Sequence, residues 1–325
     1  MHAGEFRYRA NANWAHWPAD WRVLEVTAVA TDSQDRVLVF NRGDHPVAVF
    51  DSGGQLLFSW GEGLFNRPHG IWIGPDDAVY CTDDLDHTVR KFTPDGRLLM
   101  TLGTSGAASD TGATSLDYRT IRRSGPPFHY PTNLAIAPDG ELYVSDGYGN
   151  ARIHKFSPDG QLLFSRGEPG GGPGQFHVPH GIAVDRQGIV FVADRENSRL
   201  QLFSPEGQFL NEWTDVARPC DLVIDEAGRV YVAELGYRAG LWPGQSPPPA
   251  GATGGRVSIF DSHGKLLARF GGGERPTEPG DFFAPHDIWL DSQGSLYVAE
   301  VVRSAARGER PAMGDYHTLQ KFERE

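Results

Sequence analysis

The stretch FHYPTNLAIAPDGELYVSDGYGNARIHKFSPDGQLLFSRG, residues 128–167, contains one complete copy of a repeating pattern. Apolar and polar residues alternate along its short runs, which is typical of β-strands with one buried face. The two Pro-Asp-Gly triplets favour hairpin turns, because proline presets φ and glycine accepts a positive φ. The stretch therefore predicts a four-stranded antiparallel meander.

The pattern recurs along the chain with a period of about 40 residues, which indicates a repeat protein. Clear copies begin at Phe65 and Phe176, and degenerate copies begin near Leu24, Arg218 and Phe282. Six four-stranded sheets arranged radially form a β-propeller, which leaves few strand edges exposed. We predict an all-β fold, a single six-bladed propeller of residues 1–325, with blades at about 20–61, 65–103, 128–167, 176–214, 218–272 and 282–325.

Three segments do not fit the regular period. The last copy lacks its outermost strand, and EFRYRA at residues 5–10 is an unassigned strand, so we expect it to complete the sixth blade. Residues 104–127 and 236–255 are insertions rich in Gly, Pro, Ser and Ala, and we expect surface loops there. The second insertion and residues 301–317 both follow second strands, so they could rim a pocket on one face.

Composition excludes several classes of function. The net charge of -12 and pI near 5.4 argue against a surface that tracks phosphates, because nucleic-acid binding requires a basic face. The chain has no signal-peptide pattern and no membrane-spanning apolar run. Its two cysteines cannot form a disulfide framework. We expect a cytoplasmic monomer with no nucleic-acid or membrane partner.

Histidine occupies the start of the first strand in alternate copies. In blade order this position holds Thr27, His69, Thr132, His180, Cys220 and His286. A mere repeat consensus, with each histidine hydrogen-bonded separately, should also place histidine in the odd copies. Alternate blades of a six-bladed ring lie about 120° apart, and their innermost strands line the axis. The three imidazoles would then converge, and three imidazoles with an open position are the ligand set of a catalytic Zn²⁺ site.

The loops after the second strands carry further polar residues. The second strands themselves end in residues that we expect to cap turns or hold neighbouring blades: Asn41, Asp83, Asp146, Asp194, Glu234 and Glu300. Arg42, Tyr148 and Arg195 follow three of these positions. Arginine binds carboxylates in a forked geometry, and a tyrosine beside a cation and a metal can act as a base. With the three histidines, they indicate a site for an anionic or carbonyl-bearing substrate.

The motifs NRGDH, PHGI, YVSDGYGNARI, VPHGIAVD, VADRENSRLQ and PHDI resemble the NHL repeats of peptidyl-α-hydroxyglycine α-amidating lyases from about Leu24 to Glu325. The resemblance implies a Zn²⁺ ion bound by His69, His180 and His286. It implies catalytic roles for Tyr148, Arg42 and Arg195. It also implies a structural Ca²⁺ bound by Asp287 and main-chain carbonyls. The family reaction cleaves a carbinolamide, R-CO-NH-CH(OH)-COO⁻, to an amide and glyoxylate.

Several positions depart from that family. Secreted members carry disulfides, whereas this chain has Gly149 at one cysteine position and an apolar cross-strand pair, Phe191 and Leu202, at another bridge. The family's Met before Pro-His is replaced by Ala284, which opens space beside the metal. Cys220 shares the ring of the histidines, either as a pocket wall, which we favour, or as an adventitious ligand.

These observations favour a Zn²⁺-dependent lyase acting on a small or short peptide-like α-hydroxy-amide. One alternative is a metal-dependent lactonase or related hydrolase, although such propellers usually have carboxylate-rich Ca²⁺ centres. The other alternative is a non-catalytic NHL scaffold that recruits protein or RNA. The acidic charge weakens the RNA version, and a scaffold has no need for histidine in alternate blades.

Overall fold

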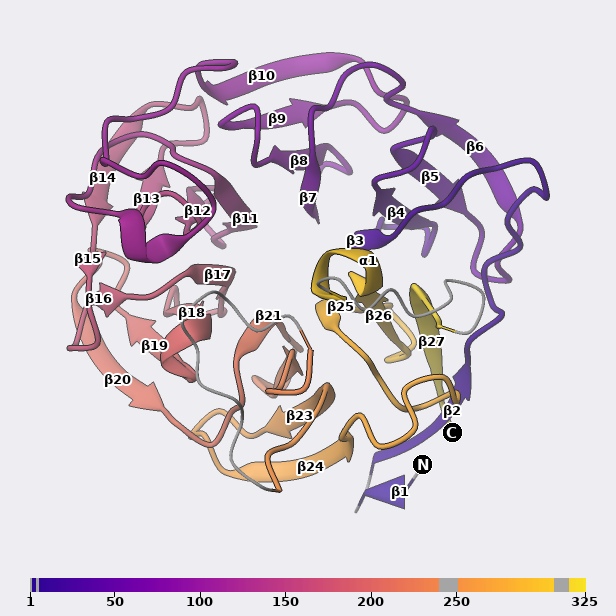
Figure 1. Cartoon of the computed structure of the whole chain (residues 1–325). Coiled ribbons are helices and arrows are strands. Elements are labelled where there is room, and N and C mark those ends of the chain that lie inside the picture. The colour runs from indigo at the N-terminus through magenta and orange to yellow at the C-terminus, as the bar shows by residue number, and fades with distance from the viewer. Residues whose placement is uncertain (1, 4–5, 240–250, 307–315) are drawn as a thin grey trace. The chain divides into compact units, whose positions relative to one another are not determined.

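The computed structural model describes residues 2–3, 6–239, 251–306 and 316–325. These residues fall into two compact units: a first unit of residues 1–62 and 220–325, and a second unit of residues 63–219. Nearly all regular structure is β, and the six large sheets are the blades of a β-propeller, which confirms the predicted fold class (Figure 1). Among the described residues, no helix is long and apolar enough to cross a membrane.

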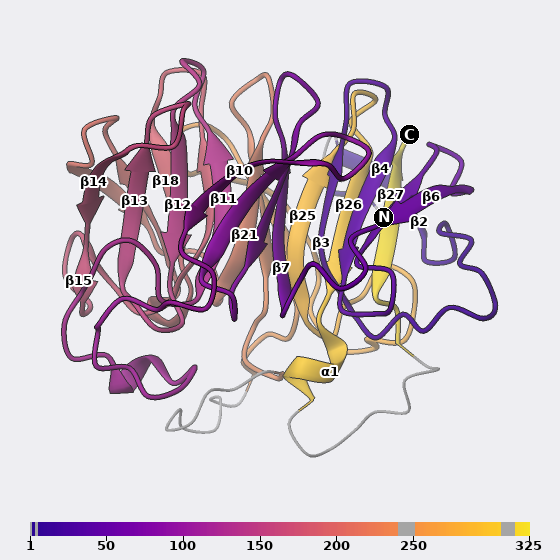
Figure 2. The same cartoon turned by 90° about the horizontal axis from the view of Figure 1, so that it is seen from above.

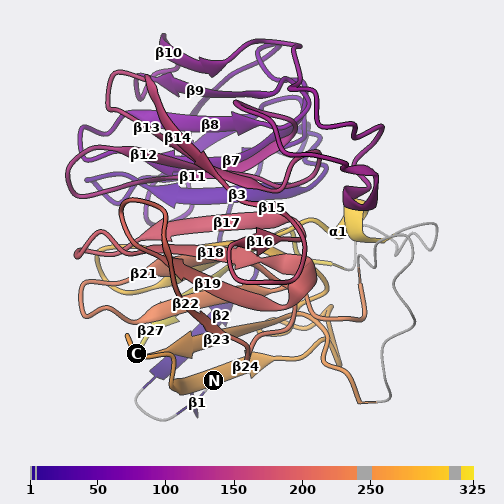
Figure 3. The same ribbon diagram turned by 90° about the vertical axis from the view of Figure 1, so that its left-hand side faces the viewer.

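The second unit contains three blades whose strands pair in chain order. The first consists of β7 (Pro68–Ile73), β8 (Val79–Asp83), β9 (Thr88–Phe92) and β10 (Leu98–Gly103). The next consists of β11 (Pro131–Ile136), β12 (Leu142–Asp146), β13 (Arg152–Phe156) and β14 (Leu162–Arg166) (Figure 2). The third consists of β17 (Pro179–Val184), β18 (Val190–Asp194), β19 (Arg199–Phe203) and β20 (Phe209–Trp213). The short strands β15 (Glu168–Pro169) and β16 (Gln175–Phe176) pair between the last two blades (Figure 3).

The first unit contains the other three blades. One consists of β3 (Val26–Thr31), β4 (Val37–Asn41), β5 (Val47–Phe50) and β6 (Leu56–Trp60). Another consists of β21 (Pro219–Ile224), β22 (Val230–Glu234), β23 (Arg256–Phe260) and β24 (Leu266–Gly271). The last consists of β25 (Pro285–Leu290), β26 (Leu296–Glu300), β27 (Leu319–Arg324), β2 (Phe6–Asn11) and β1 (His2–Ala3).

The N-terminal strand completes the last blade, as predicted. β2 runs antiparallel to β27, with Tyr8 opposite Arg324 and Asn11 opposite Lys321. Glu5, which the predicted strand included, lies outside the described residues.

The predicted turns and strands follow from the residues that form them. Gly140 and Gly160 have φ values of 87° and 88°, which only glycine adopts easily, and each backbone N–H closes a turn at 2.9 Å. The inward faces of neighbouring blades pack together; Tyr143 and Ile153 of one blade share a cluster with Ile182 of the next. The core therefore lies between adjacent blades within each unit.

The acidic residue that ends a second strand holds the segment leading into the first strand of its own blade. In each case a buried carboxylate accepts a backbone N–H, at 2.8 to 3.0 Å: Asp83 from Arg67, Asp194 from His177, and Glu300 from Ala284. The bonded residues stand two or three positions before His69, His180 and His286. The expected capping role is confirmed at these positions, and it anchors each histidine-bearing strand.

The insertions are described only in part. Residues 104–127 include the single 3₁₀ turn η1 (Tyr118–Thr120), and the backbone N–H groups of Arg122 and Arg123 bond the carbonyl of Thr111. The short helix α1 (Val302–Ala305) follows β26. Residues 240–250 and 307–315, on which the expectation of a pocket rim partly rested, lie outside the described residues.

Glu300 should make stability depend on pH. Burial raises the pKa of Glu300 from 4.5 to about 7, so the folded state binds an extra proton between these values. Its contribution to stability is therefore complete below pH 4.5 and is lost as the pH rises through about 7. In Glu300→Gln, urea midpoints measured across this interval should fall less with pH than in the wild type. Glu278→Gln, which changes an exposed glutamate, is the matched control, and equal slopes for all three proteins would contradict the assignment.

Candidate metal centre

His69 and His180 are brought together within the second unit. Each is the second residue of an innermost strand, β7 or β17, and both are buried. The strand register shifts at both positions, between Pro68 and Gly70 and between Pro179 and Ile182, and such bulges redirect a side chain. As a result, the centroids of the two imidazole rings lie 4.8 Å apart.

Backbone carbonyls orient two of the imidazoles. Nδ1 of His69 lies 2.6 Å from the carbonyl oxygen of Thr132, and Nδ1 of His286 lies 2.7 Å from that of Thr27. A carbonyl can only accept, so Nδ1 of each ring must carry the proton. In the neutral ring, Nε2 is then the nitrogen without a proton, which is the usual arrangement of metal-ligating histidines.

His286 supplies the third member of the predicted ligand set. It is the second residue of β25 in the first unit and is also buried. Among the described residues, the group that could hold a metal ion consists of these three histidines. Three imidazoles with no carboxylate or thiolate in the group suit Zn²⁺ with an open coordination position.

Tyr148 contacts both histidines of the second unit. Its hydroxyl oxygen lies 3.2 Å from Nε2 of His69 and 3.0 Å from Nε2 of His180. Its side chain follows β12 and is only 5% exposed. The phenol therefore lies beside the nitrogen atoms that would face a metal ion.

Two arginines flank the Tyr148 phenol. Nη1 of Arg195 donates to the Tyr148 hydroxyl at 3.3 Å, and its guanidinium carbon lies 5.3 Å from the ring centroid. The guanidinium carbon of Arg67 lies 5.9 Å from the same centroid, and Arg67 pairs with Asp84. Two guanidinium groups therefore lie close to the ring of Tyr148.

Arg195 is itself held by a buried ion network. Its Nε donates to Glu196 at 2.9 Å, and Arg218 donates to the two carboxylate oxygens of Glu196 at 2.8 and 3.1 Å. Burial raises the pKa of Glu196, but Arg195 and Arg218 outweigh it and hold this pKa below its ordinary value. Glu196 is thus ionised and keeps the Arg195 side chain in a defined orientation.

Sequence reasoning did not single out Arg67, Glu196 or Arg218. A signal was nevertheless present, because Arg67 and Arg218 both precede the proline that begins a first strand, in RPH and RPC. Glu196 follows Arg195 within DRENS.

Arg42 lies in the first unit, after β4, in a different ion pair. Its Nη1 donates to Glu25 at 2.6 Å and to the hydroxyl of Ser304 in α1 at 2.8 Å. Burial raises the pKa of Glu25, but Arg42 and Ser304 bring it below its ordinary value. Arg42 is thus anchored beside α1, and its role as a carboxylate binder stays a prediction.

Asp287, the predicted Ca²⁺ ligand, is buried beside a second carboxylate. Its Oδ1 accepts the backbone N–H of Val29 at 3.0 Å. Burial and the charge of Asp221 raise the pKa of Asp287 well above its ordinary value. Two adjacent buried carboxylates are hard oxygen donors whose repulsion a cation would relieve, so the donor set fits Ca²⁺.

The positions that depart from the amidating lyases have clear structural settings. Cys220 and Ala284 are fully buried in one apolar cluster, which fits a wall position for Cys220. Phe191 and Leu202 are cross-strand partners, as predicted. A Cβ atom at Gly149 would lie 2.4 Å from the ring of His129, so any larger residue there would need a local rearrangement.

Comparisons with known proteins agree with this architecture. The NHL repeat family model matches residues 128–156 and 176–203. A structure of streptogramin B lyase superposes with a TM-score of 0.60 over 98% of each chain, at 12% sequence identity, which supports the fold alone.

Two curated relatives are similar over most of this chain. Human NHL repeat-containing protein 3 is 33% identical over 313 residues, which cover 90% of this chain and 81% of that protein. Drosophila melanogaster peptidyl-alpha-hydroxyglycine alpha-amidating lyase 1 is 29% identical, over 88% of this chain and 57% of its own length. The chain spans only 34% of the matching Xenopus laevis peptidyl-glycine alpha-amidating monooxygenase A. On the repeats, the blades and these similarities, the chain belongs to the NHL-repeat family that includes NHL repeat-containing protein 3.

Proposed function

We propose that the protein is a Zn²⁺-dependent lyase that cleaves the C–N bond of an α-hydroxy-amide and releases an amide and an aldehyde or glyoxylate. The observation that carries the proposal is the position of the Tyr148 hydroxyl, within 3.2 Å of Nε2 of both His69 and His180 and hydrogen-bonded to Arg195. The similarity to a peptidyl-alpha-hydroxyglycine alpha-amidating lyase supports the same reaction class.

His69, His180 and His286 would hold the ion. When bound, Zn²⁺ would supply Lewis acidity toward the α-hydroxyl oxygen of the substrate. The carbonyls of Thr132 and Thr27 keep the protons of His69 and His286 on Nδ1, which leaves Nε2 for the ion.

Tyr148 is positioned to move the proton that this reaction transfers. Held by its hydrogen bond to Arg195, it would act as the base that takes the proton of the substrate hydroxyl. The hydroxyl carbon then forms a C=O bond, and the C–N electron pair passes to the amide nitrogen. Tyr148 can return the same proton to that nitrogen, so no other acid or base is needed. Arg195 would also bind the substrate carboxylate, because guanidinium pairs with it in a forked geometry.

Asp287, with Asp221 beside it, would bind a structural Ca²⁺ in the same proposal. The substrate would be a small molecule or a short peptide-like α-hydroxy-amide, and the protein would act as a cytoplasmic monomer.

Zinc content tests the metal site directly. Elemental analysis of the purified protein should find about one equivalent of zinc, the stoichiometry of a single three-histidine site. His180→Ala should lose the zinc and keep the β-type circular dichroism spectrum. His263→Ala, which removes an exposed histidine, is the matched control and should keep the zinc. If carboxylates bound the metal, as in a hydrolase, all three proteins would contain the same amount of metal. If the protein were a metal-free scaffold, all three would lack zinc.

Tyr148→Phe tests the proton transfer. Glyoxylate release from α-hydroxyhippurate should fall by about 10²- to 10⁴-fold, the usual contribution of a positioned acid–base group. Zinc content should be unchanged, because the phenol is not one of the proposed ligands. Tyr118→Phe, in which the altered ring packs against His177, is the control and should keep full turnover. Full activity in Tyr148→Phe would remove Tyr148 from the mechanism.

A further inference from the structure

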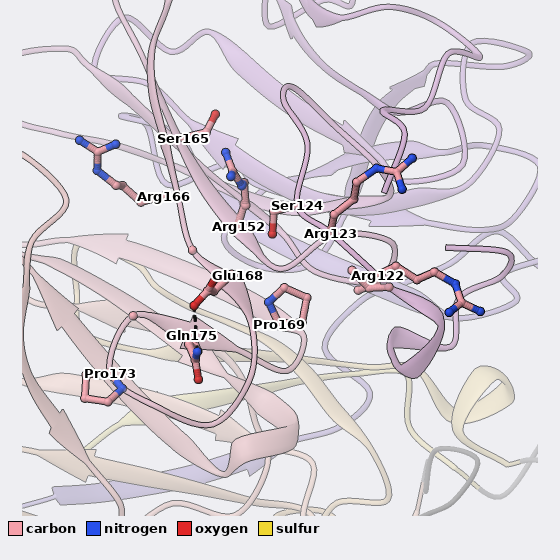
Figure 4. A pocket seen from close by; sticks show the side chains of 13 residues that line it. Arg122, Arg123, Ser124, Arg152, Ser165, Arg166, Glu168, Pro169, Pro173 and Gln175 are labelled. Carbon is pink, nitrogen blue, oxygen red and sulfur yellow. Dashed lines mark hydrogen bonds between the residues drawn. The ribbon is translucent and has the colours of Figure 1, made fainter. Parts of the chain in front are cut away.

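A polar pocket lies in the second unit, between the insertion of residues 104–127 and the outer part of the blade β11–β14. It has a volume of about 730 Å³, which suits a small molecule. Its charged lining consists of four arginines and one glutamate: Arg122, Arg123, Arg152, Arg166 and Glu168. Figure 4 shows the arginines around one side of the pocket, with Glu168 hydrogen-bonded to Gln175 on the other.

Arg152 differs from the arginines at the same place in two other blades. Arg199 and Arg256 share its register, opposite the acid that ends the second strand. Arg199 pairs with Asp194 and Arg256 with Glu234, each at 2.8 Å. Among the described residues, the Arg152 side chain has no hydrogen bond or ion pair, and its Nε is buried without a partner.

The acid opposite Arg152 has other partners. The Asp146 carboxylate accepts the backbone N–H of His129 and the side-chain amide of Asn150, both at 2.9 Å, and it faces His154 at 3.3 Å. Asp146 and Glu168 act on Arg152 only at longer range, while burial and Arg166 lower its pKa. Arg152 thus lines the pocket with its Nε unsatisfied.

Arg166 also departs from the repeat. Arg166 is on the outermost strand, opposite Ile153 of β13. At the matching position of the outermost strand, four other blades carry apolar residues: Trp60, Leu102, Trp213 and Phe270. The exposed Arg166 guanidinium lies against the Phe164 ring, with no ion pair among the described residues. This blade thus replaces a packing residue with a charge at the pocket.

The insertion contributes the remaining charges and a polar atom. Arg123 pairs with Asp110, whereas Arg122 has no such partner in the described part of the chain. The hydroxyl of Ser124 is buried in the lining without a hydrogen-bond partner. Three arginines without counterions and two unsatisfied buried polar atoms are thus collected in one pocket of a protein whose net charge is -12.

We propose that this pocket binds the di- or triphosphate group of a small molecule. Guanidinium groups bind phosphate oxygens in a forked, bidentate geometry, and several together match a multiply charged anion better than a single carboxylate. Such a ligand would supply the acceptors that Arg152 and Ser124 lack. The site is separate from the proposed zinc centre and does not depend on the lyase reaction.

Isothermal titration calorimetry with inorganic tripolyphosphate tests the pocket. The wild type should bind one equivalent, and Arg152→Gln and Arg166→Trp should each weaken binding by about tenfold or more, the loss of one charge-assisted hydrogen bond. Tryptophan is the natural residue at the matching position of two other blades, so Arg166→Trp should fold normally. The matched control is Arg97→Gln, which removes an exposed arginine from the β9–β10 turn and should leave the affinity unchanged.

Two further titrations identify the chemical source of the phosphate and distinguish this pocket from the proposed zinc centre. ATP binding more tightly than tripolyphosphate would support a nucleotide ligand, and equal affinities would support recognition of the phosphate chain itself. His180→Ala should bind tripolyphosphate like the wild type even if it loses zinc. No binding by the wild type, or equal affinities in Arg152→Gln, Arg166→Trp and Arg97→Gln, would overturn the proposal.

Discussion

The structure depends on buried carboxylates at the ends of second strands, such as Asp83, Asp194 and Glu300, which hold the backbone that enters the innermost strand of the same blade. Burial of such a group is costly, and it raises the pKa of Asp194 to about 6 and that of Glu300 to about 7. The backbone N–H groups that these carboxylates accept compensate part of that cost. The bonded residues lie two or three positions before a histidine. The same interaction therefore fixes the backbone from which each histidine side chain extends.

In the candidate metal centre, further contacts fix the orientation of the side chains. Carbonyls of neighbouring innermost strands set the tautomer of His69 and His286. In the second unit, Glu196 and Arg218 hold Arg195 against the Tyr148 phenol. The groups that would move a proton are thus buried and oriented before any substrate arrives, which is how enzymes lower the cost of reorganisation.

The repeat also provides an internal comparison between blades. Positions that keep a blade folded recur with little change, such as the arginine opposite the second-strand acid in the blades of β17–β20 and β21–β24. The blade of β11–β14 keeps the strands but changes the partners of Arg152 and places Arg166 where other blades pack an apolar side chain. A fold in which each blade contacts mainly its neighbours tolerates such local changes, and the proposed phosphate pocket lies where this blade departs from the others.

The sequence by itself determined the fold class, the six copies, the hairpin turns and the closing strand, because alternation and turn residues act on the backbone locally. It also predicted that His69, His180, Tyr148 and Arg195 lie near one another, because their positions within the repeat put them at strand ends on one side of the blades. Only the tertiary structure decided the side-chain partners: Glu196 with Arg218, Arg42 with Glu25 and Ser304, and Asp221 with Asp287. These contacts join residues from different blades or loops, and their distances depend on how the blades pack. A repeat of about 40 residues identifies the equivalent positions of the blades, but it does not predict which side chains are in contact.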